Sequence, residues 1–202
     1  MLRVALTGGI ATGKSHVLDQ MRRRGVPCLD SDTLVHGVEA AGTEATAAIA
    51  QRFGGDVLAP DGSVDRAKLA PIVFADPVAR RDLEAIVHPA VYRAITAGLR
   101  AFALVGDYPL AAVDVPLLYE TGGEKEFDRV IVAACSPALQ IARLRERGLT
   151  DEAARQRLGA QWPTDEKAAR ADFVIDTSGS FEDTNRQVDD ILLKLRSSNF
   201  DR

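Results

Sequence analysis

A glycine-rich turn near the start of the chain constrains the fold more than any other feature. The apolar run at residues 2–6 leads through Thr7 into Gly8-Gly9-Ile10-Ala11-Thr12-Gly13-Lys14-Ser15, and a helical pattern follows. This is the pattern G-x-x-x-x-G-K-S in a strand–loop–helix context. Gly8 and Gly13 permit backbone angles and close approaches that a Cβ atom would block. The sequence therefore predicts a phosphate-binding loop (P-loop), whose N–H groups lie at the positive end of a helix.

The residue types in this turn indicate what each position binds. Lys14 provides a mobile positive charge for the β- and γ-phosphates of ATP, and the Ser15 hydroxyl is a ligand for Mg²⁺. We expect the nucleotide to contact the whole loop and the first turn of the helix, that is, Gly8, Gly9, Ile10, Ala11, Thr12, Gly13, Lys14, Ser15 and His16.

Five short apolar segments predict the strands of a sheet. Most are continuous apolar runs, which is typical of parallel strands covered on both faces. Helical patterns separate them, so we expect a doubly wound α/β fold, a P-loop NTPase core with a five-stranded parallel sheet flanked by helices. The predicted strands are residues 4–7, 26–30, 110–115, 130–134 and 173–176, and helices are predicted over 15–24 and 183–196.

Two helical insertions interrupt this core. Residues 33–105 separate the second strand from the third, and a simple crossover needs far less chain. Helical patterns within this insertion cover residues 43–53, 65–75 and 77–105. A second, polar insertion runs over residues 137–171, which leaves 1–32, 106–136 and 172–202 as the nucleotide-binding core.

Several classes of P-loop protein fit the sequence poorly. The Asn-Lys-x-Asp element that reads guanine in regulatory GTPases is missing, and 202 residues are few for a motor or transport ATPase. A small-molecule or nucleotide kinase needs an acceptor site and a mobile lid, for which the two insertions are candidates. A nucleotide-dependent binding module without an acceptor is the alternative from another class.

Acids at the ends of two predicted strands are candidates for the chemistry. The carboxyl ends of parallel strands face the ligand crevice, and alternation would put Asp30 and Asp32 on the same side. One could accept a proton from an attacking hydroxyl while the other helps to hold metal-bound water. The competing interpretation is that Ser31 or Asp32 caps the next helix. Asp114 ends an apolar strand, an arrangement typical of a Mg²⁺ ligand.

Basic residues are concentrated in the second insertion. Arginine suits phosphate, and a closing lid can deliver it while water is excluded. We expect at least two of the five to lie on a solvated face: Arg143, Arg145, Arg147, Arg155 and Arg157. His88, before Pro89, is a lone histidine of the first insertion and by itself favours a structural role.

Composition excludes some partners. The net charge of −4 gives no global positive field for nucleic acid or anionic lipid. The N-terminal apolar run is too short for a secretory signal, and no stretch reaches the roughly 20 apolar residues of a membrane span. We therefore expect a cytoplasmic protein, a monomer or small homo-oligomer, with Cys28 and Cys135 as reduced core thiols.

Together these residues resemble the dephospho-CoA kinase family over nearly the whole chain. Each matching piece alone is weak, but their order and spacing are specific. In chain order they are Leu6–Ile10 with the P-loop, Asp30-Ser31-Asp32, Phe53-Gly54-Gly55, residues 61–66, Val73-Phe74, His88-Pro89, residues 115–120, Ala160-Gln161 and residues 171–176.

This resemblance implies transfer of the ATP γ-phosphate to the 3′-hydroxyl of the ribose of dephospho-CoA, the last step of coenzyme A biosynthesis. It implies a helical CoA-substrate domain in the first insertion and a lid in the second. Asp32 would be the general base, and Arg147 a lid arginine that approaches ATP. Asp176 would begin a turn near the adenine, while His88 and Leu117 would lie on the acceptor side.

The chain departs from the family pattern at a few positions. Ala11-Thr12 replaces the commoner Gly-Ser, and His16 stands where threonine is common. Gly148 follows Arg147 in place of the usual acid, and Thr177 replaces asparagine. The backbone N–H groups of the loop and the Ser15 hydroxyl are retained in spite of these changes.

Overall fold

The computed structural model describes residues 1–197 and divides the chain into two compact units. The first comprises residues 1–29 and 101 onwards, and the second comprises residues 30–100. We call the second the helical unit. Residues 198–202, which the sequence analysis includes in the core, lie outside the described residues.

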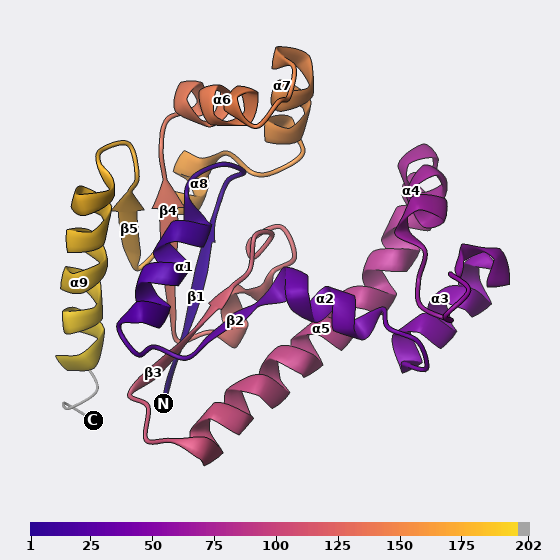
Figure 1. Cartoon of the computed structure of the whole chain (residues 1–202), viewed down its shortest axis with the longest axis horizontal. Coiled ribbons are helices and arrows are strands. Elements are labelled where there is room, and N and C mark those ends of the chain that lie inside the picture. Colours follow the sequence, from indigo (N-terminus) through magenta and orange to yellow (C-terminus); the bar gives the residue numbers. More distant parts are fainter. Residues whose placement is uncertain (198–202) are drawn as a thin grey trace. The chain divides into compact units, whose positions relative to one another are not determined.

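A five-stranded sheet in the order β2-β3-β1-β4-β5 forms the centre of the first unit (Figure 1). The pairs β1–β3, β1–β4 and β4–β5 are all parallel. This order confirms the predicted doubly wound α/β fold. The strands are β1 (Leu2–Gly8), β2 (Cys28–Asp30), β3 (Leu110–Asp114), β4 (Arg129–Ala134) and β5 (Phe173–Asp176).

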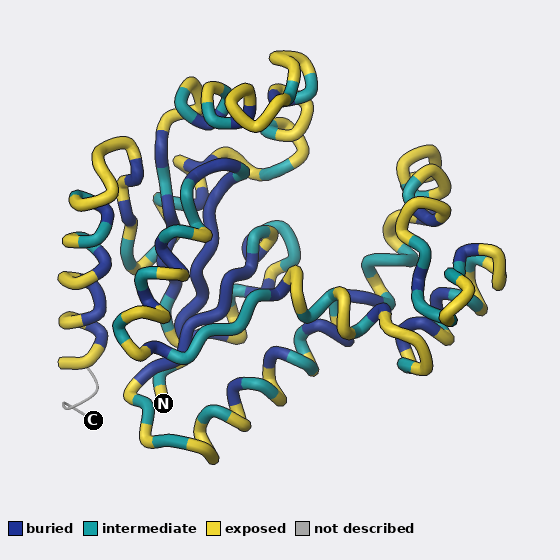
Figure 2. Tube along the Cα trace, viewed as in Figure 1, coloured by how far each residue is buried: buried dark blue, intermediate teal, exposed yellow. Residues whose placement is uncertain are grey.

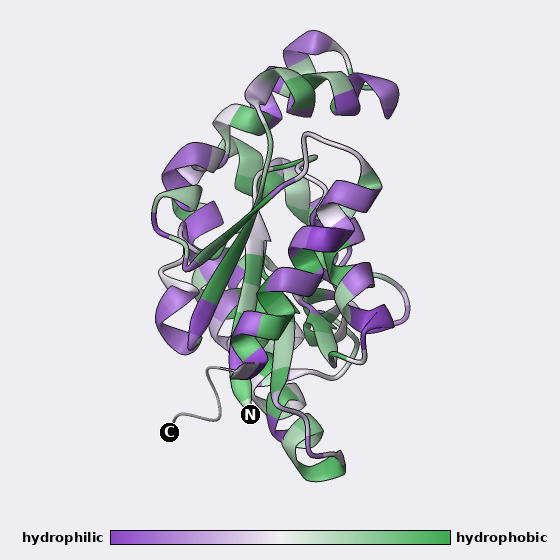
Figure 3. Cartoon of the chain, turned by 90° about the vertical axis from the view of Figure 1, so that its left-hand side faces the viewer, coloured by the Kyte–Doolittle hydropathy of each residue, from purple (hydrophilic) through white to green (hydrophobic). Residues whose placement is uncertain are grey.

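Two helices cover one face of this sheet. In α1 (Lys14–Arg23), Val17, Leu18 and Met21 form one buried stripe. In α9 (Phe181–Ser197) a similar stripe, ending at Leu195, packs into the same core cluster as the strands. Full burial of each such side chain stabilises the fold by about 1.5–3 kcal/mol. Figure 2 shows the buried positions along the strands and on one side of α9, and Figure 3 shows strands more hydrophobic than the helices around them.

The second insertion is helical, as the sequence predicts. It contains α6 (Pro137–Glu146), α7 (Asp151–Gly159) and the short α8 (Thr164–Ala168), which contacts β4 and β1. Side-chain oxygens cap the first two helices, because Ser136 accepts from Leu139 N and Thr150 accepts from Ala153 N. Leu144 and Ala154 pack with Ala11 in a small separate core.

Residues 31–105 form α2 (Ser31–Val38), α3 (Glu44–Phe53), α4 (Arg66–Ala75) and α5 (Pro77–Val105), with a short 3₁₀ turn, η1 (Gly55–Val57), after α3. The last three helices confirm those predicted for the first insertion. Thr43 and Asp65 cap α3 and α4 through their side chains. None of the helices in residues 1–197 has both the length and the apolar composition of a membrane span.

Candidate active site

The P-loop connects β1 to α1 within the first unit. Gly8 ends β1, and a Cβ atom there would overlap the carbonyl oxygen of Ala133 on β4. Gly13 has φ 87°, a left-handed conformation that L side chains rarely adopt, and α1 begins at the next residue. The loop is therefore shaped by the two glycines that the motif requires, and it ends at the positive end of a helix.

Hydrogen bonds inside the loop involve the residues predicted to bind phosphate. Lys14 Nζ donates to Gly9 O (3.2 Å), and Thr12 Oγ1 donates to the same carbonyl (2.9 Å). Ala11 has φ 58°, the one positive φ among the described non-glycine residues. A glycine would adopt this conformation without strain, so the alanine is held there by its surroundings.

Arg143 on α6 joins the P-loop to the segment after β5. Its guanidinium donates to Ala11 O (3.1 Å) and to Thr177 O (2.6 Å). Thr177 Oγ1 in turn donates to Thr12 O (2.7 Å). Arg143 is one of five candidate arginines in the sequence, and the family resemblance instead implies Arg147, which caps the C-terminus of α6 and is exposed. Residues four apart are neighbours on the surface of a helix, so the spacing of Arg143 and Arg147 was a sequence signal that also pointed to Arg143.

The turn after β5 carries an exposed aromatic residue beside the P-loop helix. Asp176 ends β5, and its side chain accepts from Ser178 N (2.8 Å). Phe181 begins α9 with 68% of its surface exposed, and its ring lies 4.6 Å from that of His16. His16 Nε2 is 2.9 Å from Asn185 Oδ1, which fixes the imidazole. The sequence analysis did not single out Phe181.

Asp114 lies at the carboxyl end of β3, where its Cα is the register partner of Leu6 on β1. It is 9% exposed. An aspartate carboxylate and the Ser15 hydroxyl offer the hard oxygen ligands that Mg²⁺ prefers, and Mg²⁺ commonly keeps water and phosphate as its other ligands. Groups of three or more acidic, histidine or cysteine side chains able to hold a metal are absent from residues 1–197. By their chemistry, Asp114 and Ser15 fit a Mg²⁺ that also keeps phosphate and water oxygens as ligands.

A buried ion pair holds the chain just after Asp114. Lys167 on α8 is fully buried, and its Nζ lies 2.7 Å from Glu120 Oε1. The same ammonium donates to Pro116 O (3.0 Å), and Thr7 Oγ1 donates to that carbonyl too (3.3 Å). Leu117, the next residue, is 40% exposed. The segment that carries Leu117 is therefore fastened at its start to β1 and to α8.

In the helical unit, Asp30 and Asp32 have different environments. The side chain of Asp30 caps α2, because its Oδ1 accepts from Asp32 N (2.9 Å) and Thr33 N (3.2 Å). The expectation that strand alternation puts both acids on one side is wrong, since the strand ends at Asp30 and α2 begins at Ser31. The cap is Asp30, rather than Ser31 or Asp32, and the Asp32 side chain is exposed.

Asp32 lines a cavity of about 480 Å³ in the helical unit. His36, Glu39 and Arg66 also line it, and apolar side chains that include Leu69 and Phe74 line the rest. His36 Nδ1 donates to Asp32 O (2.7 Å), so its Nε2 can accept from Arg66 Nη1 (3.2 Å). Arg66 Nε also donates to Glu39 (2.6 Å). The cavity therefore combines an exposed carboxylate, a guanidinium paired with a second carboxylate, and an apolar wall. His88 is half-buried on α5 and is not among its lining residues.

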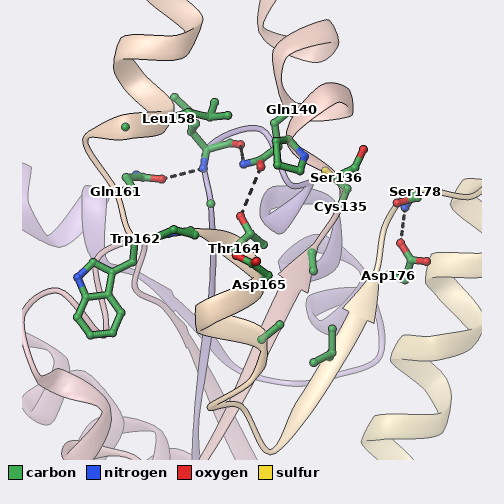
Figure 4. Close-up of a pocket in the computed structure, with 18 residues that line it drawn as sticks. Cys135, Ser136, Gln140, Leu158, Gln161, Trp162, Thr164, Asp165, Asp176 and Ser178 are labelled. Atoms are coloured by element: carbon green, nitrogen blue, oxygen red, sulfur yellow. Dashed lines mark hydrogen bonds between the residues drawn. The ribbon is translucent and has the colours of Figure 1, made fainter.

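A second cavity, of about 750 Å³, lies in the first unit beside the P-loop (Figure 4). It is bounded by Ile10, by Gln140 and Gln161 of the second insertion, and by Asp176 of β5. Cys135 also lines it, and burial raises the pKa of this thiol. Burial likewise raises the pKa of Cys28 to about 11, although the charge of Arg22 opposes the shift. Both cysteines are free, as predicted.

Comparisons with known proteins point to one family. A family model described as dephospho-CoA kinase matches residues 2–183. A dephospho-CoA kinase of Anaeromyxobacter dehalogenans is 48% identical over 96% of this chain and 92% of its own length. One of Leifsonia xyli is 43% identical over 97% of this chain and 100% of its own.

Solved structures show the same fold. The Thermus thermophilus protein TT1252 superposes with a TM-score of 0.81 at 33% identity, covering 96% of this chain and 97% of its own. A dephospho-CoA kinase from Campylobacter jejuni, at 24% identity and a TM-score of 0.72, covers 98% of both chains and supports the fold alone. With its P-loop, its parallel sheet and a family match over nearly its full length, the chain belongs to the dephospho-CoA kinase family.

Proposed function

We propose that this protein transfers the γ-phosphate of ATP to the 3′-hydroxyl of the ribose of dephospho-CoA, giving coenzyme A and ADP. The family match over residues 2–183 carries this proposal. Support comes from the P-loop at the start of α1 and from the cavity lined by Asp32 and Arg66. Its guanidinium suits a phosphorylated acceptor, and its apolar wall suits the organic part of the molecule.

In this mechanism the acceptor hydroxyl attacks the γ-phosphorus, and the bond from phosphorus to the β–γ bridging oxygen breaks. Asp32 orients the hydroxyl and takes its proton, while Lys14 and the lid arginine Arg147 stabilise charge on the transferring group. Ser15 and Asp114 would hold Mg²⁺, and when bound this ion would neutralise phosphate charge. The P-loop from Gly8 to Ser15, with His16 and Asp176, binds the nucleotide. His88 and Leu117 contact the acceptor.

We also propose that residues 33–105 form the substrate domain, that 137–171 act as the lid, and that the enzyme works in the cytoplasm as a monomer or small homo-oligomer. Positioning and electrostatic stabilisation would supply most of the rate enhancement. A lid that closes over the nucleotide would exclude water and so prevent hydrolysis.

An acceptor screen tests the activity. ATP-dependent release of ADP is measured with dephospho-CoA, nucleoside monophosphates and shikimate, and the product is identified by mass spectrometry. We expect coenzyme A from dephospho-CoA alone. Turnover of another acceptor would assign a different small-molecule kinase, and slow hydrolysis that no acceptor stimulates would indicate a nucleotide-dependent binding module.

Asp32→Asn tests the general base. Turnover should fall by at least ~10²-fold, which is the low end of general-base contributions, and ATP affinity should be preserved. Asp30→Asn is the matched control, because asparagine caps a helix about as well as aspartate does and should leave turnover near that of the wild type. Near-normal turnover of Asp32→Asn would remove Asp32 from this role.

A further inference from the structure

Ile10 of the P-loop is hydrogen-bonded on both of its backbone polar groups by side chains of the second insertion. Gln140 Nε2, on α6, donates to Ile10 O (2.7 Å). Gln161 Oε1, between α7 and α8, accepts from Ile10 N (2.8 Å). Both bonds are drawn as dashed lines in Figure 4. One loop residue is thus held from two separate places in the segment between β4 and β5, one on α6 and one between α7 and α8.

The surroundings of Gln140 are closely packed. Gln140 is only 3% exposed. Its Oε1 accepts from Thr164 Oγ1 (3.4 Å), at the start of α8. A Cβ atom on Gly9 would overlap Thr164 Oγ1 and press against Gln140. The amide is therefore fixed by contacts on both sides. A buried amide costs free energy unless it is hydrogen-bonded, so this arrangement depends on the bond to Ile10.

The simplest alternative is that both glutamine side chains only fill space. The hydrogen bonds argue against it, because Gln140 donates to the carbonyl of Ile10 and Gln161 accepts from the N–H of the same residue. Side chains that only fill space would not need to match a donor to one group and an acceptor to the other. In addition, Gln161 takes an N–H group of the loop whose N–H groups are predicted to hold phosphate.

We propose that Gln140 and Gln161 are positioning residues that set the conformation of the P-loop at Ile10, so that the second insertion and the phosphate site move together. The proposal rests on the proposed function in taking the P-loop as the donor site. When the insertion moves over a bound nucleotide, the two amides carry that movement to Ile10. The loop then holds the phosphates in the transfer geometry only while both amides are bonded.

The opposite polarity of the two bonds gives a sharp test. Gln161→Glu keeps an oxygen that accepts from Ile10 N, whereas Gln161→Met removes it. Gln140→Glu replaces the donor with a carboxylate that faces Ile10 O, and Gln140→Met leaves that carbonyl without this donor. Loss of one of these partly buried hydrogen bonds should lower kcat by about tenfold in Gln161→Met and in both Gln140 variants. Gln161→Glu should stay within about threefold of the wild type.

Three measurements separate positioning from general destabilisation. The KM for dephospho-CoA should not change, the melting temperature should be retained for Gln161→Met, and hydrogen exchange of the Ile10 amide should accelerate in Gln161→Met but not in Gln161→Glu. Gln156→Glu is the matched control, because it makes the same change at an exposed position of α7. It should leave every measurement unchanged.

The outcomes decide the proposal whichever acceptor the enzyme uses. Binding of ADP, followed by calorimetry, and exchange of the Ile10 amide need no acceptor, so they remain readable if dephospho-CoA proves wrong. Equal effects of Gln161→Glu and Gln161→Met on the amide and on kcat would overturn the proposal. So would Gln140 and Gln161 variants that behave like Gln156→Glu.

Discussion

Replacing Lys167 with methionine should destabilise the protein far more than removing a surface ion pair. The ammonium is fully buried, 2.7 Å from Glu120 Oε1 and 3.0 Å from Pro116 O. Its loss leaves the carboxylate of Glu120, whose side chain is 16% exposed, with the hydrogen bond from Trp162 N (2.9 Å). Breaking a buried pair in this way costs about 3–5 kcal/mol.

The partial exposure of Glu120 places the expected cost near the lower end, about 3 kcal/mol. For a chain of this size that corresponds to a fall in melting temperature of roughly 6–12 °C. Thermal unfolding followed by circular dichroism, with urea unfolding at 25 °C, measures the effect. Arg145→Met is the control: its partner Asp151 lies 3.1 Å away, but both side chains are more than half exposed, so the cost should be below about 1 kcal/mol.

A double-mutant cycle tests the reasoning itself. Glu120→Gln alone leaves a buried ammonium without its counter-charge and should be about as costly as Lys167→Met. The variant with both substitutions removes both charges and should melt closer to the wild type than the sum of the single effects predicts. Strictly additive losses, or a loss no larger than that of Arg145→Met, would refute the view that the two buried charges depend on each other.

Three further predictions concern the nucleotide site and the thiols. Phe181→Ala should weaken ATP binding at least about fivefold in calorimetry, because a base stacked on an aromatic ring gains about 1 kcal/mol or more, and binding of inorganic triphosphate should not change; equal losses for both ligands would contradict a contact with the base. Ala11→Val should lower the melting temperature by at least about 4 °C, since a β-branched residue is strongly disfavoured at φ 58°, whereas Ala11→Gly should not lower it. Cys28, whose pKa burial raises to about 11, should react with iodoacetamide at pH 8 at least about tenfold more slowly in the folded protein than in urea, and its rate should rise until the pH reaches about 11; equal rates in both states would show that the thiol is not buried.

The sheet could be predicted from sequence because its strands carry their signal locally. β3 and β4 are continuous apolar runs, and their observed bounds lie within one residue of those predicted. β2 is shorter than predicted, because it begins only at Cys28. Val26, where the strand was predicted to begin, is buried in the core without being part of the strand. Apolar periodicity reports burial, and burial alone does not show where strand pairing begins.

The contacts that organise the site could not be predicted in this way. Gln140 and Gln161 bond Ile10 across 130 and 151 residues of chain. Gln161 belongs to a piece of the family resemblance, but no local pattern shows that either side chain bonds Ile10. Lysine and glutamate side chains are usually solvated, so Lys167 and Glu120 have an ordinary sequence signature although they form a buried pair. The cap formed by Asp30 was within reach, because an acid directly before a helical segment is a local signal.

The guanidinium of Arg143 also bears on how quickly a nucleotide reaches the loop. The chain carries a net charge of −4, so its long-range field opposes the approach of a polyanion such as ATP. Arg143, bonded to Ala11 O and Thr177 O, places a positive charge beside the loop. The attraction of a nucleotide to Arg143 then acts close to the loop, whereas the repulsion comes from the net charge of the whole chain. At 0.1 M salt this repulsion is screened beyond about 10 Å. Added salt should therefore slow nucleotide association less here than on a uniformly basic phosphate-binding surface.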